Sequence, residues 1–195
     1  MTAVAFVQEY GAPRSGSGVA LAELGLEGSP AMADLAEIPG YGVFEDGLVS
    51  IASERELVGG LGGWETWLPK DARLFGTSAF GLLLLVTAAD EPWVVDVHHG
   101  QIVESDLTVP QLVATLAETE SRDDILRAPL FRRWHEFEGD ALAAREVLCP
   151  TPVPALGGAW SIETLARMSL EVLLSFTAQL FDDPSATVEI RRRRR

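Results

Sequence analysis

The sequence predicts an α+β fold, in which an antiparallel sheet meander packs against helices and the C-terminal half is helical. Two observations lead to this class. Short apolar segments separated by turns fill residues 73–105, and the longer helical patterns follow them, from residue 108. Strands followed by helices, without regular alternation, indicate α+β and argue against a doubly wound sheet. With 195 residues, 47% of them hydrophobic, the chain can bury a core as one domain or as two small lobes.

Before the meander the sequence predicts short elements. Brief helices are predicted near residues 19–24 and over 31–38, and Pro39 stops the second. The stretch GYGVFEDGLVSI follows at residues 40–51. Its glycines stand beside carboxylates and not beside a lysine, so a turn entering a strand at 48–51 is favoured over a phosphate-binding loop.

Ser53 is placed to cap a helix, with Glu54 and Glu56 in the first turn, where the helix dipole favours acids. The segment GGLGG at residues 59–63 holds four glycines, and each costs about 1 kcal/mol inside a helix. A loop is therefore expected there, with helix resuming at WETWL.

The meander is predicted to contain strands at residues 73–78, 80–87, 92–98 and 101–105. The second of them, FGLLLLVT, is apolar throughout, which is typical of a strand buried on both faces, and Phe80 is expected in the core. A two-residue turn at His99 and Gly100 is predicted to join the last two strands.

The C-terminal half carries helical patterns. Thr108 is the predicted cap of an amphipathic helix whose apolar positions are Val109, Leu112, Val113 and Leu116. One or two helices, broken at Pro129, are predicted over residues 121–142. A proline-rich link at 149–158 then leads to a closing helix over 169–181, whose wide apolar face implies burial.

Charge is the most informative bulk property. The formal net charge of the chain is −14, and removing the five arginines at 191–195 lowers it to −19 for residues 1–190. An acidic body of this kind disfavours binding to nucleic acid and to anionic membranes, and it favours a basic protein partner. Acidity can also serve solubility alone. The terminal arginines are predicted to form a basic tail outside the fold.

Other features of the sequence limit the classes of protein to which this chain is expected to belong. The N-terminal stretch lacks the basic region of a secretory signal, and the sequence has no run of 18 apolar residues, so a soluble cytoplasmic protein is expected. Cys149 is the only cysteine, which excludes an internal disulfide and a cysteine-based zinc site. It lies among prolines without a nearby His or Asn, so a buried cysteine or a loop cysteine is expected, and not a catalytic thiol.

The residues offer little that would specify an enzyme. Asp96 and His98 are predicted to share one strand face, and with His99 they could supply metal ligands. The only other histidine, His135, belongs to a different element, so a third ligand is missing from the pattern. Ser78 lacks the Gly-x-Ser-x-Gly context of a nucleophile. We expect no metal and no cofactor.

Several motifs, in this order, resemble one bacterial family: FVQEYGAP, GYGVFEDGL, WETWL, TSAFG, VVDVHHGQI and VPALGG. The family is that of GAD-like-domain proteins whose C-terminal half is the domain found in type VI secretion immunity proteins. The resemblance implies a divergent GAD-like part at residues 1–70 and an immunity-type domain at 71–190. It implies a protein without catalytic activity that binds and blocks a cognate toxin, often a nuclease, in the cytoplasm.

An immunity or antitoxin-like inhibitor, acting by steric and electrostatic occlusion of a basic toxin, is therefore the first functional prediction. The acids expected to face the partner are Glu45, Asp46, Asp123, Asp124, Glu136 and Glu138. Two alternatives remain open at this point. One is a metal-dependent enzyme built on Asp96, His98 and His99, and the other is an acidic adaptor in a larger complex.

Overall fold

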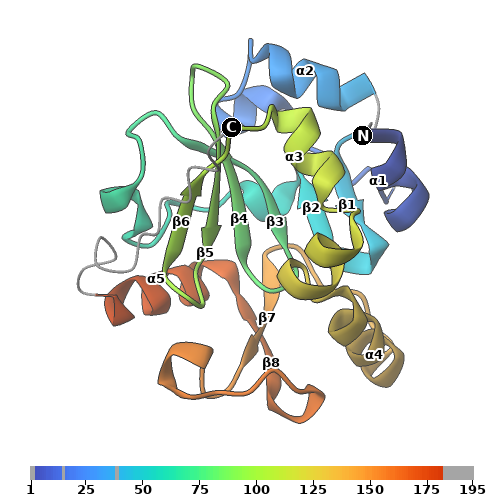
Figure 1. Ribbon diagram of the computed structural model, residues 1–195, viewed down its shortest axis with the longest axis vertical. Helices are drawn as coiled ribbons and strands as arrows, with labels where there is room; N and C mark the ends of the chain where they lie inside the picture. Colours follow the sequence, from blue (N-terminus) through green and yellow to red (C-terminus); the bar gives the residue numbers. More distant parts are fainter. Residues whose placement is uncertain (1–2, 15, 38–39, 182–195) are drawn as a thin grey trace.

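A six-stranded antiparallel sheet forms the centre of the computed structural model, which describes residues 3–14, 16–37 and 40–181 (Figure 1). Each strand pairs with the next in the chain. The strands are β1 (Gly42–Phe44), β2 (Val49–Ile51), β3 (Arg73–Ser78), β4 (Leu82–Val86), β5 (Pro92–Asp96) and β6 (Gln101–Glu104). A separate two-stranded hairpin consists of β7 (Glu146–Pro150) and β8 (Leu165–Ser169). The predicted α+β class with an antiparallel meander is confirmed.

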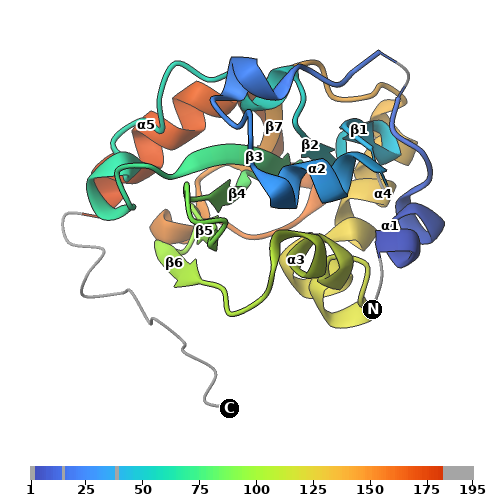
Figure 2. The same cartoon turned by 90° about the horizontal axis from the view of Figure 1, so that it is seen from above.

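Helices cover both faces of the sheet. They are α1 (Ala3–Tyr10), α2 (Pro30–Glu37), α3 (Val109–Thr115), α4 (Ala128–Glu138) and α5 (Leu170–Leu180). Viewed from above, α5 lies on one side of the sheet, and α1 and α3 lie on the other (Figure 2). A π-helical turn, Ser121–Ile125, precedes α4.

The central strand β4 is apolar at every position because it lies between two hydrophobic clusters. Leu82 and Leu84 belong to the hydrophobic cluster that includes α1, α2 and α3. Leu83 and Leu85 belong to the second cluster, which includes α5 and β7. Successive side chains of a strand point to opposite faces, so a strand between two cores must be apolar at every position. Burial of this strand on both faces, and of Phe80 just before it, is confirmed.

Several predicted details are also confirmed. Thr108 caps α3, and its side chain accepts a hydrogen bond from the Gln111 N–H. The glycine-rich segment at 59–63 is a loop, and it packs against α5: a Cβ on Gly62 would stand 2.5 Å from the Ser175 nitrogen. Glycine therefore permits a close approach between this loop and the helix.

Other details were wrong. The β5–β6 connection has four residues and not two, because Asp96 pairs with Gln101. The carboxylate of Asp96 accepts hydrogen bonds from the backbone N–H groups of His98 and His99, which closes the longer loop. Pro129 does not break a helix but lies in the first turn of α4, where its missing N–H costs nothing.

Sequence reasoning also missed elements and overestimated one. The helices and strands it did not predict are α1, β1, β7 and β8. The helix expected after Ser53 is a single 3₁₀ turn, Glu54–Glu56, in which Glu56 is buried and not solvated. The sheet also runs across residue 70, since β2 pairs with β3.

Among the described residues no helix has the length and apolar character needed to cross a membrane. The predicted basic tail at 191–195 and the end of the predicted helix at Ile38 lie outside the described residues.

Candidate partner-binding surface

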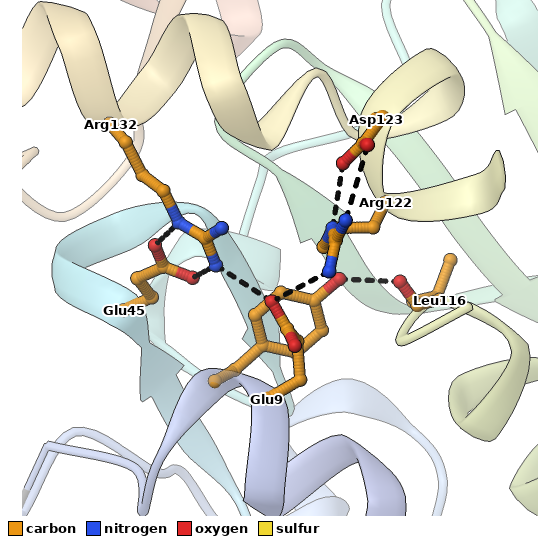
Figure 3. A network of polar contacts seen from close by, with 7 residues as sticks. Glu9, Glu45, Leu116, Arg122, Asp123 and Arg132 are labelled. Carbon is orange, nitrogen blue, oxygen red and sulfur yellow. Dashed lines mark hydrogen bonds and ion pairs between the residues drawn. The ribbon is translucent and has the colours of Figure 1, made fainter. Parts of the chain in front are cut away.

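An ion-pair network joins three of the elements around the predicted acidic surface (Figure 3). The guanidinium of Arg132, on α4, donates to both carboxylate oxygens of Glu45, and its Nη2 lies 2.9 Å from an oxygen of Glu9 on α1. The hydrogen bond to Glu45 is the largest cause of the raised pKa of Arg132. A fork-to-fork pair of this kind fixes geometry as well as charge.

Arg122 extends the same network. It approaches Glu9 at 3.4 Å and binds Asp123 through two nitrogens, at 2.6 and 3.2 Å. The hydrogen bond from Arg122 lowers the pKa of Asp123. Beside them, the hydroxyl of Tyr10 donates to the carbonyl of Leu116, and burial raises the pKa of Tyr10. Glu45 and Asp123 are therefore internal partners of arginines and not free acids.

The glycine turn that presents Glu45 is a constrained segment. Glu45 and Asp46 both have positive φ, at 42° and 51°. The buried Arg55 donates to the carbonyl of Gly47 at 2.8 Å, which supports the turn from below. Asp46 is half exposed and lies 3.5 Å from Arg14 and 3.6 Å from His135. The expectation that this turn exposes both acids is thus wrong for Glu45 and correct for Asp46.

The other three predicted acids are exposed. Asp124 lies on the π-helical turn, and Glu136 and Glu138 lie in the last turn of α4. None of the three has an ion-pair partner among the residues that the structure describes. Of the predicted partner-binding residues, they have the charge most open to another molecule.

The candidate metal ligands are arranged differently from the prediction. Asp96 ends β5, and its Oδ2 lies 2.8 Å from Nδ1 of His99, which raises the pKa of His99. His98 lies in the loop and not on the strand, and its buried ring donates from Nε2 to the Phe80 carbonyl at 2.8 Å. Within the described ranges no group of three or more His, Cys, Asp or Glu residues could hold a metal ion.

His98 belongs to a cluster of aromatic rings. Trp160 packs edge-on against His98 and Phe80, with ring centroids 4.9 and 5.5 Å apart. The guanidinium of Arg127 lies 4.1 Å above the Trp160 ring, a cation–π geometry. The backbone of Arg127 has a φ of 53°, in the left-handed region that a residue other than glycine rarely adopts. This cluster joins the β5–β6 loop, the start of α4 and the loop after β7.

A buried polar cluster surrounds Glu56, which the sequence predicted only as an acid in the first turn of a helix. The carboxylate accepts hydrogen bonds from the hydroxyls of Ser50, Ser53 and Thr77 and from the Ser53 N–H. Burial raises its pKa, although the bonds from Ser50 and Ser53 oppose the shift. The capping-box spacing of Ser53 and Glu56 was the one sequence signal for this contact.

Of the two expected placements, buried or in a loop, Cys149 has the first: it is buried in β7. Burial raises the pKa of its thiol to about 11, so the reactive thiolate is scarce near neutral pH.

No family model matches the chain, and no curated protein matches it. The fold resembles that in the crystal structure of Atu4351 from Agrobacterium tumefaciens, with a TM-score of 0.65 over 90% of this chain and 87% of that chain. The sequence identity is 17%, so this likeness concerns the fold alone. The resemblance to GAD-like and immunity-type domains stays a prediction.

Proposed function

We propose that this protein is a non-enzymatic inhibitor of the immunity or antitoxin type, which binds a cognate basic toxin in the bacterial cytoplasm and blocks it by occlusion. The motif resemblance to type VI secretion immunity proteins supports the proposal, and a nuclease toxin fits it, because nucleases present basic surfaces to their substrate.

The observation that carries the proposal is the distribution of acids. The net charge is −14, yet Glu45 and Asp123 are already paired with arginines. The acids left without partners among the described residues include Glu136 and Glu138, both exposed in one turn of α4. Exposed, unpaired charge speeds the encounter with an oppositely charged protein.

The proposal expects a toxin gene beside the gene for this protein, and stopped-flow association with the product of that adjacent gene tests it. The association rate should fall steeply as salt is raised, because attraction is screened beyond about 10 Å at 0.1 M salt, while dissociation changes less. Reversing Glu136 and Glu138 to Lys should slow association and leave folding intact.

A matched control reverses Glu27 and Asp106, two exposed acids on other segments, which carry no ion pair in the described part of the chain. Failure of the two proteins to bind would end the proposal. A rate that ignores both salt and charge reversal would show that acidity serves solubility and not recognition.

A further inference from the structure

The C-terminal turn of α4 exposes an aromatic ring. Phe137 is 76% exposed, more than any other large hydrophobic side chain that the structure describes. Its neighbours on the inner face of the helix, Phe131 and Trp134, are 1% and 3% exposed. The inner face of α4 is therefore packed without Phe137, and the helix does not need this side chain to stay in place.

The same turn carries acids where a helix disfavours them. Glu136 and Glu138 lie at the negative end of the helix dipole, and His135 is the only basic residue of the last turn. Asp140, also exposed, follows immediately after Gly139, which ends the helix in the left-handed conformation. An exposed Phe and adverse charges in one turn are two departures from what stability alone selects, and such departures gather at functional sites.

Contacts from neighbouring elements also hold the backbone on both sides of this turn in place. Arg132 anchors α4 to Glu45 and Glu9, and the guanidinium of Arg167 lies 4.9 Å from the ring of Trp134. Just beyond the helix, the Leu142 N–H donates to the carbonyl of Asp46. A side chain that protrudes from a fixed backbone loses little freedom on binding, which suits an anchor residue.

We propose that the turn of Glu136, Phe137, Glu138 and Asp140 is the contact surface for the partner, with Phe137 as its apolar anchor. This inference rests on the proposed function and specifies the partner's chemistry: an apolar pocket that accepts the ring, bordered by lysine or arginine side chains that meet the three acids. Aromatic residues at the centre of an interface, ringed by polar contacts, carry a large share of binding energy.

The acidic charge of this turn favours a basic protein over two other kinds of binding partner. A second copy of the chain would bring the same three acids against their like, which disfavours self-association through this turn. An anionic membrane would accept the ring but repel the carboxylates. Arg133, exposed one turn earlier, is the only base among the exposed positions of α4, so the end of the helix stays acidic.

Binding of the adjacent-gene protein to Phe137→Ala, measured by calorimetry or interferometry, tests the anchor. Affinity should fall by at least about 30-fold, the level of a hot-spot residue, while Phe137→Leu retains most of it. The control is Val172→Ala on α5, since Val172 is also exposed, at 58%, and lies away from these acids. It should bind like the wild type, and all three variants should melt within a few degrees of it.

The outcomes separate the two proposals. If the wild type binds and Phe137→Ala binds equally well, the anchor is wrong and the inhibitory function stands. If the wild type does not bind, both fail. If Phe137→Ala changes the oligomeric state of the isolated protein, the turn is a self-interface and the inference is overturned.

Discussion

The ring of His98 is buried and uncharged, and the stability of the protein should therefore depend on pH in a defined direction. The Phe80 carbonyl can only accept a hydrogen bond, so Nε2 of His98 carries the proton, and Nδ1 has no partner among the described atoms. Burial lowers the pKa of His98 from 6.5 to about 4, although Asp96 opposes the shift. His99 and Arg127, also nearby, act with burial.

The effect follows from the two pKa values. A group whose folded pKa lies below its unfolded pKa binds fewer protons in the folded state, so stability is complete above pH 6.5 and is lost as the pH falls toward 4. At about 1.4 kcal/mol per pH unit, the full loss is about 3 kcal/mol, of which about 2 kcal/mol appears between pH 8 and pH 5.

Chemical denaturation of the wild type and of His98→Gln at pH 8 and pH 5 measures this loss. Glutamine stays neutral and can still donate to the Phe80 carbonyl, so the variant should be less stable at pH 8 but lose about 2 kcal/mol less on acidification. Groups that do not interact with His98 titrate alike in the two proteins, so their contribution cancels in the difference between them. Equal losses in both proteins would show that the pKa of His98 is the same in the folded and the unfolded state, which would contradict the prediction.

Two further predictions concern the same region. Phe80→Ala should lower the free energy of unfolding by about 3–5 kcal/mol, because Phe80 is 3% exposed and packs on Trp160; a change within about 0.5 kcal/mol in a denaturant titration would contradict its place in the core. Elemental analysis of the purified protein should find no stoichiometric zinc, iron or manganese, because the ring of His98 is bound to a carbonyl; one ion per chain, lost in His98→Ala, would favour the metal-dependent enzyme.

The parts of the fold that the sequence predicted are those with long or regular patterns. The leucines of β4 and the capped, periodic α3 are examples. β7 was hidden because Pro150 ends it and further prolines follow, which are signals of a loop and not of a strand. β1 has three residues and α1 eight, too few for a periodicity to stand out.

The sequence identified the acidic residues of the candidate surface but could not show which of them form ion pairs. Glu45 resembles a free acid in the sequence, but its partner Arg132 lies 87 positions away, and only the tertiary fold brings the two together. Phe137 was not singled out, because an aromatic residue within a helical pattern is usually buried. Its exposure is visible only once Phe131 and Trp134 are seen to fill the inner face.

The order of the strands has a consequence for synthesis. Each strand of the central sheet pairs with its neighbour in the chain, so the meander can form hairpin by hairpin as it leaves the ribosome. α1 is made before the sheet, but its polar contacts are with Leu116, Arg122 and Arg132, which lie 106, 113 and 123 residues from their partners on that helix. Until α3 emerges, the side of α1 that packs against it stays uncovered, and apolar surface exposed in this way is what chaperones recognise on a nascent chain.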